Sequence, residues 1–297
     1  MDIELMQDFS EVVHYENTEI PFYISTSNLF EYPDRSVQCH WHDDIEWIFI
    51  LKGTMCYYVN GKHLILKEKD CLMVNARQMH YGYAYKQQNC YFLCILFHPS
   101  LFGCNQILVE KYVKPILENK SLEYLYLDSE QKEDAEFQEF LTKIVYLKEQ
   151  KAEGYELEVI ASMYILWSRL LQKKELFIGQ SGQKMSGDLK IQRDMVSFLY
   201  QHYSEKITLD EIAVSGHVSR SKCCRIFQYY LQQSPIDFLN AYRLKVSCYL
   251  LRNTEKSVTE IAFACGFNHL SYFSKIFFER YGCTPRVYRN ANKSFET

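Results

Sequence analysis

The chain has 297 residues, which is enough for two domains that each bury a core of their own. Its hydrophobic fraction of 47% is typical of a globular protein, and its formal charge of −4 at pH 7 excludes a uniformly basic chain. No apolar run reaches the length of a membrane span, and no basic segment followed by an apolar run opens the chain. We therefore expect neither membrane contact nor a signal peptide.

Eleven cysteines are scattered along the chain, none of them in paired CxxC spacing. An odd number in a chain without an export signal argues against a disulfide framework and predicts a cytoplasmic protein with reduced thiols. Several, such as Cys71, Cys90 and Cys94, fall at apolar positions, where a thiol packs as a small hydrophobic group.

The first hundred residues are predicted to form short β-strands, at 46–51, 55–59, 63–66, 71–74 and 90–97. The dipeptide Asn60-Gly61 stands between two of these runs, and it is the pair that two-residue hairpin turns prefer. Many short strands joined by tight turns indicate a β-sandwich or a small barrel.

Four residues of this region have side chains that commonly ligate metals: His40, His42, Glu46 and His80. The first three stand at even spacing, so on one continuous strand they would face the same side of the sheet. Three imidazoles and a carboxylate suit a divalent transition metal such as zinc, iron, manganese or nickel.

Two segments around these residues resemble the motifs of the cupin fold. HWHDDIEWIFILKG, from His40 to Gly53, matches the first motif: His-x-His, three residues, Glu, six residues, Gly. DCLMVNARQMH, from Asp70 to His80, resembles the second, with Ala76 and Gln78 where Pro and Gly are usual. The resemblance covers about residues 20–105 and implies a cupin-like β-barrel.

From about residue 109 the apolar period becomes helical. Phe137, Leu141 and Ile144 define one amphipathic helix, and Ile160 and Trp167 lie on the apolar side of another. These helices could pack on the barrel of their own chain or against a partner chain, and the sequence leaves both arrangements open.

The stretch GQSGQKMSG at residues 179–187 has no apolar period, which predicts a flexible linker between two domains. The charge changes sign across it. Residues 1–187 hold 18 Lys and Arg against 27 Asp and Glu, a net of −9, and residues 188–297 hold 15 against 10, a net of +5. Only the C-terminal part therefore suits a polyanion.

Residues 257–285, SVTEIAFACGFNHLSYFSKIFFERYGCTP, have the pattern of a helix-turn-helix. Ser257 and Glu260 can form a capping box at the start of the first helix. Gly266 suits a corner with positive φ, and Phe273 and Phe277 mark the buried side of the second helix.

Residues 208–235 repeat this plan about fifty residues earlier, with Thr208 and Glu211 as the matching capping box. Between the two copies, residues 235–251 are predicted to form one helix. Its predicted buried side consists of Leu239, Tyr242, Val246, Tyr249 and Leu250.

The two copies together resemble the double helix-turn-helix domain of the AraC/XylS family of bacterial transcription regulators. The pattern IAxxxGFxxxSYFSxxFxxxxGxTPxxYR is met from Ile261 through Arg289, and the resemblance covers about a hundred residues. One departure is Gln232, since such families often have Gly after the first recognition helix. The resemblance implies a regulator that binds double-stranded DNA and carries its effector domain in the N-terminal barrel.

This resemblance implies an α+β protein of two domains. Residues 1–178 would form a cupin-like effector-binding and dimerisation domain, with the barrel at about 20–105 and helices at about 109–178. Residues 179–187 would form the linker and residues 188–297 the DNA-binding domain. Arg225 is the predicted base contact of the first unit, because a guanidinium pairs with guanine in bidentate fashion. By position in the two recognition helices, the side chains expected to reach DNA are Arg220, Ser221, Lys222, Cys224, Arg225, His269, Leu270, Ser271, Ser274 and Lys275.

In such regulators the barrel generally holds a small molecule, here expected to be a sugar or another small solute. The histidines would then hold a divalent transition metal, hydrogen-bond the effector without metal, or serve the structure alone, and the sequence leaves these three alternatives open. The predicted effector pocket comprises His40, His42, Glu46 and His80, with Trp41, Trp47 and Tyr81 as stacking walls.

The expected function is sequence-specific transcriptional regulation in response to a small-molecule effector, by a homodimer with RNA polymerase as a further candidate partner. The alternative is a metal-dependent cupin enzyme, an oxygenase or isomerase, fused to a DNA-binding domain. Its metal would be held by the same four residues. The sequence offers no clear acid, base or substrate-carboxylate group beyond them, so we predict that the protein is not an enzyme.

Overall fold

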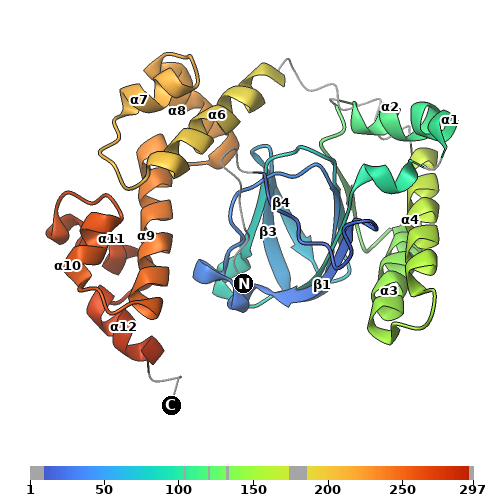
Figure 1. Cartoon of the computed structure of the whole chain (residues 1–297), viewed down its shortest axis with the longest axis horizontal. Coiled ribbons are helices and arrows are strands. Elements are labelled where there is room, and N and C mark those ends of the chain that lie inside the picture. Colours follow the sequence, from blue (N-terminus) through green and yellow to red (C-terminus); the bar gives the residue numbers. More distant parts are fainter. Residues whose placement is uncertain (1–9, 104, 120, 132–133, 174–185, 294–297) are drawn as a thin grey trace. The chain divides into compact units, whose positions relative to one another are not determined.

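The computed structural model describes residues 10–103, 105–119, 121–131, 134–173 and 186–293. The chain divides into two compact units, Met1–Ser186 and Gly187–Thr297 (Figure 1). Of the predicted linker, residues 179–185 lie outside the described residues, and Ser186 and Gly187 begin helix α6 (Ser186–His202). The helix therefore includes the last two residues of the predicted linker.

The strands of the first unit form two antiparallel sheets (Figure 1). One sheet has the strand order β1-β7-β2-β5-β8 and the other has the order β4-β3-β6. Apolar side chains of both sheets meet in one buried cluster, which includes Ile48 and Leu72 of the first sheet and Met55 and Leu66 of the second. The sheets therefore face each other, and the predicted α+β fold class is confirmed. The strands are β1 (Phe22–Asn28), β2 (Ile45–Lys52), β3 (Thr54–Val59), β4 (Lys62–Lys67), β5 (Cys71–Val74), β6 (His80–Ala84), β7 (Tyr91–Phe97) and β8 (Tyr124–Leu127).

The five predicted strands correspond to β2, β3, β4, β5 and β7, each within one residue at either end. The hairpin between β3 and β4 turns at Asn60 (φ 48°) and Gly61 (φ 82°), as predicted from a pair that tolerates positive φ. Strands β1, β6 and β8 were not predicted. In β1, polar Ser25 and Ser27 interrupt the apolar pattern, so the run lacks the composition of a buried strand.

Strand β2 is buried on both faces, which places different chemistry on each side of the sheet. Glu46, Ile48 and Ile50 alternate with Trp47 and Phe49, and all five are buried. Because successive side chains point to opposite faces, the first set faces the other sheet and the second set faces outward. Trp47 and Phe49 must therefore be buried by elements that pack on the outer face of this sheet.

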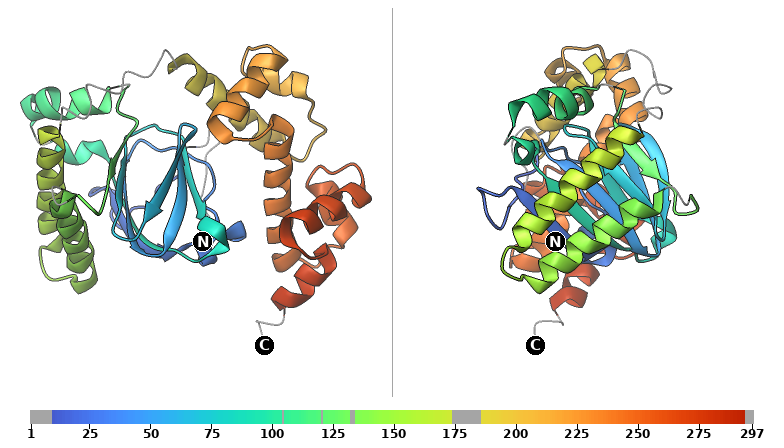
Figure 2. Two further views of the ribbon diagram at one scale, coloured as in Figure 1. Left: turned by 180° about the vertical axis from the view of Figure 1, so that it is seen from behind. Right: turned by 90° about the vertical axis from the view of Figure 1, so that its right-hand side faces the viewer.

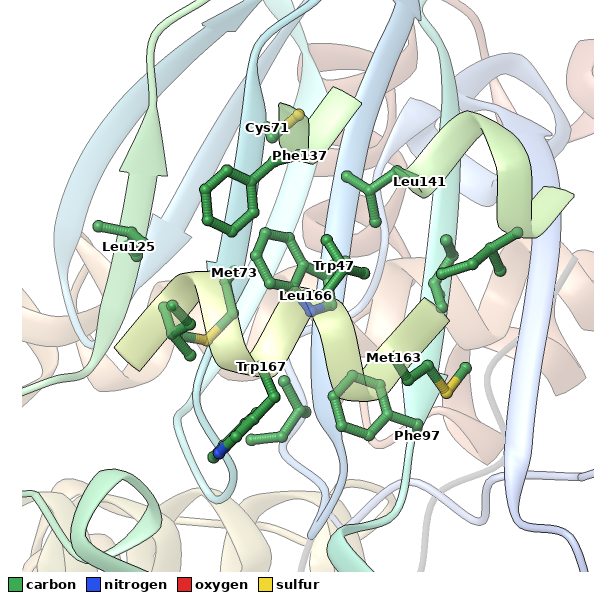
Figure 3. Packing of buried hydrophobic residues seen from close by; sticks show 14 of the residues in the cluster. Trp47, Cys71, Met73, Phe97, Leu125, Phe137, Leu141, Met163, Leu166 and Trp167 are labelled. Carbon is green, nitrogen blue, oxygen red and sulfur yellow. The ribbon is translucent and has the colours of Figure 1, made fainter. Parts of the chain in front are cut away.

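These elements are the helices α3 (Ala135–Gln150) and α4 (Tyr155–Gln172), which run side by side in Figure 2. The ring of Trp47 stacks on Phe137 of α3 with a centroid distance of 5.6 Å, and Met163 and Trp167 of α4 join the same layer (Figure 3). Each large side chain buried in this way contributes about 1.5–3 kcal/mol. Of the two arrangements that the sequence left open, the helices pack on the sheet of their own chain.

Short helical segments complete the first unit. They connect β1 to β2, β6 to β7, and β7 to β8. These segments are η1 (Leu29–Glu31), η2 (Pro33–Arg35), η3 (Tyr85–Gln87), η4 (Pro99–Phe102), α1 (Gln106–Leu108), η5 (Val109–Val113) and α2 (Lys114–Leu117).

The described part of the second unit is helical, with two helix-turn-helix pairs joined by α9 (Figure 1). The first pair is α7 and α8, and the second is α10 and α11. The helices are α6, α7 (Leu209–Ser215), α8 (Arg220–Leu231), α9 (Pro235–Asn253), α10 (Val258–Ala264), α11 (Leu270–Tyr281) and α12 (Pro285–Lys293).

The buried side of α9 differs from the predicted one. Tyr249 is 53% exposed, whereas Leu244, Cys248 and Leu251 are buried against α10 and α11. Phe238, one turn from the start of α9, instead packs its ring on Phe227 of α8. One helix serves two helix-turn-helix units, so its apolar residues do not form the single stripe that a one-sided helix shows.

Candidate effector cavity and nucleic-acid interface

The four predicted ligating residues come together inside the barrel. One nitrogen each of His40, His42 and His80 lies within 4.8 Å of the others, and all three side chains are buried. The carboxylate of Glu46 joins them, since its Oε2 lies 2.8 Å from His80 Nε2 and 3.7 Å from His42 Nε2. His40 and His80 pair as an isolated antiparallel bridge, which brings the two sequence motifs together.

Backbone carbonyls orient the three imidazoles. The Nδ1 atoms of His40, His42 and His80 lie 2.7, 3.1 and 2.8 Å from the carbonyl oxygens of Gln38, Asp44 and Gln78. A carbonyl oxygen only accepts, so each Nδ1 carries the proton and donates it. In a neutral ring the lone pair is then on Nε2, the atom that points toward the neighbouring rings.

Glu46 is an ionised carboxylate with two protein donors. Burial opposes its charge, but the neighbouring His80 and His42 bring its pKa well below the usual value. The Tyr57 hydroxyl donates to Oε2 at 3.1 Å and the Cys94 thiol donates to Oε1 at 3.5 Å. Burial, together with the charge of Glu46, raises the pKa of Tyr57, so this hydroxyl keeps its proton.

A cavity of about 310 Å³ opens beside this cluster, between the two sheets. His40 and Glu46 line it, and His42 and His80 lie next to them outside the lining. Sequence reasoning missed most of the other polar walls, although alternation in β1 would have revealed Tyr23, Ser25 and Ser27 as one face. The remaining lining residues are Glu11, Val12, Val13, His14, Tyr23, Ser25, Ser27, Tyr32, Val37, Ile48, Met55, Tyr57, Phe92, Cys94 and Leu96.

The three aromatic residues predicted as stacking walls lie elsewhere, and this prediction is corrected. Trp47 packs outward against α3. The ring of Tyr81 stacks on that of Tyr58, its neighbour in the three-stranded sheet. Trp41 bridges to Ser10 and is likewise absent from the cavity lining. Each of the three directly follows a cluster residue in the sequence, so an extended backbone turns it to the opposite face.

The donor set suits a divalent transition metal. Three imidazole nitrogens and a carboxylate oxygen are ligands that zinc, iron, manganese and nickel accept. Each histidine donates its other ring N–H to a carbonyl, as ligating histidines in proteins commonly do. The cluster could therefore hold such an ion at the edge of the cavity.

In the C-terminal unit, both predicted capping boxes are present. The amide of Thr208 donates to Glu211 Oε2 at 2.7 Å, and the amide of Ser257 donates to Glu260 Oε2 at 2.7 Å. The predicted corner at Gly266 has φ 81°, and a Cβ there would lie 2.4 Å from the carbonyl oxygen of Tyr203. These features fix where each first helix begins and how sharply the chain turns into the second.

The residues predicted to reach DNA lie on the first two turns of α8 and α11, together with His269 just before α11. All ten are exposed or half-exposed. Arg220 pairs with Asp210, and the Nζ of Lys222 lies 2.8 Å from Asp188, so acidic neighbours within the unit hold both cations. Arg225 is exposed and makes no ion pair within the part of the chain that the structure describes.

Comparison with known proteins agrees with both halves of this picture. The family model of an AraC-like ligand binding domain matches residues 29–166, and that of a helix-turn-helix domain matches residues 212–291. The HTH-type transcriptional regulator YdeC of Bacillus subtilis (strain 168) is 30% identical over 287 residues, which are 96% of this chain and 97% of that protein. The chain belongs to the AraC family of transcriptional regulators.

The HTH-type transcriptional activator RhaS of Salmonella paratyphi B is 24% identical over 264 residues, 86% of this chain and 89% of that protein. Among solved structures, that of an apo ToxT variant from Vibrio cholerae covers 93% of this chain and 98% of its own, with 14% identity and a TM-score of 0.43.

This chain is thus an AraC-type DNA-binding transcriptional regulator with an N-terminal ligand-binding domain, as the sequence predicts. The named relatives are bacterial regulators of transcription. Within the described residues, every helix is too short or too polar to cross a membrane.

Proposed function

We propose that a small molecule binds in the barrel cavity of this regulator and changes how the chain engages DNA. The observation that carries this proposal is the lining of the 310 Å³ cavity, where His40 and the carboxylate of Glu46 lie beside hydroxyl groups and apolar side chains. Tyr57, Ser25 and Ser27 supply those hydroxyls. A few fixed polar groups in a mostly apolar cavity select a small, oxygen-rich solute such as a sugar.

The test begins with the solutes that copurify with the full chain, released by denaturation and identified by mass spectrometry. DNA binding is then measured with and without the identified solute. Ser27→Val should abolish the response to the solute, because Ser27 lines the cavity. Thr26→Val is the matched control, since Thr26 is exposed on the opposite side of β1 and should leave the response unchanged. A response that survives Ser27→Val would contradict the site.

For DNA, we propose that α8 and α11 enter successive major grooves on one side of the duplex, about 34 Å apart. The exposure of the ten predicted contact residues at the start of these helices supports this proposal. A net charge of only +5 on residues 188–297 gives modest nonspecific affinity, so two sites bound by a homodimer are the expected functional form.

We propose that the dimer forms through the outer faces of α3 and α4. Leu157 is 74% exposed there, and Tyr146 and Ile165 are also exposed, whereas the opposite faces of both helices are buried on the sheet. Leu157→Glu should shift sedimentation toward the monomer. Full-length protein should respond to the effector only on DNA with two correctly spaced sites, and an effector response by a monomer on a single site would contradict this geometry.

The relatives named above are regulators, which favours a non-enzymatic role over the metal-dependent enzyme. One of them is named an activator, so we propose RNA polymerase as a further partner. A protein that acts on bacterial chromosomal DNA works in the cytoplasm, and we propose that location. Catalytic turnover by the purified chain with the identified effector would favour the enzyme instead.

A further inference from the structure

The segment of residues 10–14, called the N-terminal arm below, brings a second carboxylate to the histidine cluster. The amide of Glu11 donates to the carbonyl oxygen of Trp41 at 2.8 Å, and Ser10 pairs with the same residue in a parallel bridge. Trp41 stands between His40 and His42, so this pairing holds the arm alongside the ligand-bearing segment. Glu11 Oε2 then lies 3.4 Å from His40 Nε2.

The histidine cluster has more hydrogen-bond acceptors at its centre than donors to satisfy them. With the three Nδ1–H groups donated to carbonyls, the lone pairs of three neutral imidazoles converge at Nε2. Among the described residues, the Nε2 atoms of His42 and His80 are buried without a hydrogen-bond partner. Protonating the rings would crowd three positive charges within 4.8 Å in a buried space, which is also unfavourable.

Two carboxylates complete the donor set. Glu11 Oε2 lies 3.4 Å from His40 Nε2, and Glu46 Oε2 lies 2.8 Å from His80 Nε2. The cavity lining contains no lysine or arginine among the described residues, so it offers these carboxylates no fixed cation. A divalent cation would balance the two carboxylates and accept the lone pairs that converge on it.

The spacing of the donor atoms is compatible with such an ion. Bonds of about 2.1 Å place adjacent ligand atoms about 3.0–3.4 Å apart and opposed ones about 4.2 Å apart. The pairs Glu46–His80, Glu11–His40 and Glu46–His42 are separated by 2.8, 3.4 and 3.7 Å, and the imidazole nitrogens lie within 4.8 Å of one another. Contraction by a few tenths of an ångström would enclose the ion.

We propose that Glu11 joins His40, His42, His80 and Glu46 around one divalent transition-metal ion, so that the ion fastens the N-terminal arm across the cavity. Glu11, Val12, Val13 and His14 all line the cavity, and metal occupancy thus controls how firmly this wall is held. The inference concerns the wall of the proposed effector cavity and deepens that function. Its experiments measure bound metal and arm exchange, and they stand whether or not an effector is found.

The first experiment titrates the untagged, metal-stripped full chain with Co²⁺ and follows the visible d–d bands, together with elemental analysis of chain purified without chelator. We expect one ion per chain. His42→Ala should weaken Co²⁺ binding at least about tenfold, because it removes a ligand. His63→Ala is the matched control, since His63 is exposed on β4 and stacks on Tyr58 outside the cluster, and it should bind Co²⁺ like the wild type.

The second experiment isolates the role of the arm. Glu11→Gln should weaken Co²⁺ binding and change the d–d bands, and Glu19→Gln, at an exposed carboxylate outside the cluster, should do neither. Hydrogen exchange of the peptide containing residues 10–14 should slow when Co²⁺ binds the wild type. In Glu11→Gln, at Co²⁺ concentrations that fill the remaining four-ligand site, this slowing should be lost.

The outcomes separate the two parts of the proposal. Wild-type chain that retains less than about a tenth of an equivalent of metal and shows no Co²⁺ bands would overturn the metal site, since elemental content and the wild-type titration do not depend on how any variant folds. Normal Co²⁺ binding and normal arm protection in Glu11→Gln would overturn the fifth ligand while leaving the four-ligand site. Neither result bears on DNA binding by the C-terminal unit.

Discussion

The two helix-turn-helix units share one backbone and differ in the side chains that this backbone presents. Both begin with a capping box and turn through a residue of positive φ, His217 (φ 52°) in the first and Gly266 (φ 81°) in the second. Both recognition helices also end in a left-handed residue, Gln232 (φ 55°) and Gly282 (φ 70°). The departure at Gln232 therefore leaves the shape of that corner unchanged.

The chemistry of the exposed faces separates the units. The first recognition helix carries Arg220, Lys222 and Arg225 and is capped by the Ser219 side chain, which accepts from the Lys222 amide. The second begins at Leu270 after His269, without a side-chain cap. The comparison teaches that glycine and capping positions set the scaffold, while the recognition face varies independently on it. We expect the cationic first unit to contribute more of the salt dependence of DNA binding.

The largest expected effect tests why the corner of the second unit needs glycine. Gly266→Ala should destabilise the C-terminal unit by about 3 kcal/mol, because the added Cβ meets the Tyr203 carbonyl in a backbone of positive φ. At the matched corner, His217→Gly should be neutral or slightly stabilising, since it relieves a non-glycine residue of positive φ.

Urea unfolding of the full chain, followed by circular dichroism at 222 nm, measures this difference. All three tryptophans, Trp41, Trp47 and Trp167, lie in the first unit, so tryptophan fluorescence serves as an internal control that should not change. Equal losses of stability in Gly266→Ala and His217→Gly would show that the corner at Gly266 has no special need for glycine.

The next effect concerns DNA recognition. Arg225→Ala should weaken specific binding by about 1–3 kcal/mol and relax the preference at one base pair, because a guanidinium can pair with a guanine edge. Lys275 is the matched residue of the second unit, and its Nζ lies 3.8 Å from Glu279. Lys275→Ala should weaken binding to all sequences similarly and lower the salt dependence, as loss of a phosphate contact does. Binding-site selection with both variants measures this, and an unchanged sequence preference in Arg225→Ala would remove Arg225 from the specificity residues.

Capping should matter equally in both units, since the two boxes have the same geometry. Ser257→Ala and Thr208→Ala should each cost about 1 kcal/mol of unfolding free energy, from the loss of a side-chain acceptor at the helix start. Hydrogen bonds from Ser257 hold the pKa of Glu260 below 4.5, so the box contributes above that pH and is lost as pH falls through the lowered pKa. A cost of Glu260→Ala that persists undiminished at pH 3 would contradict this pH dependence.

The smallest effect is expected at the end of α8. Gln232→Gly should stabilise the C-terminal unit by about 0.5 kcal/mol, because glycine adopts φ 55° more readily than glutamine and the first unit would then end as the second does. The gain is limited by the greater freedom of glycine in the unfolded chain. It is also limited by the loss of the hydrogen bond that the side-chain amide of Gln232 donates to the Tyr229 carbonyl. A destabilised Gln232→Gly variant would show that this side-chain bond outweighs the backbone strain.

The features that depend on a few neighbouring residues could be predicted from the sequence. Capping boxes, the Asn60-Gly61 hairpin and the corner at Gly266 were all predicted, because each needs only the chemistry of residues three or four positions apart. The alternation expected along residues 40–47 was also readable. Applied consistently, it would have excluded Trp41 and Trp47 from the cavity, since each adjoins a residue predicted to face it.

The segments that share a site although they are distant in sequence could not be predicted in this way. Glu11 lies beside the histidine cluster because the N-terminal arm pairs with Trp41. The periodicity of the sequence near Glu11 gives no sign of that pairing. The buried residues of helix α9 could not be predicted for the same reason, since different parts of its surface pack against the two helix-turn-helix units. Helix caps, turns and strand alternation are set by residues a few positions apart, whereas a shared cavity depends on packing between segments far apart in the chain.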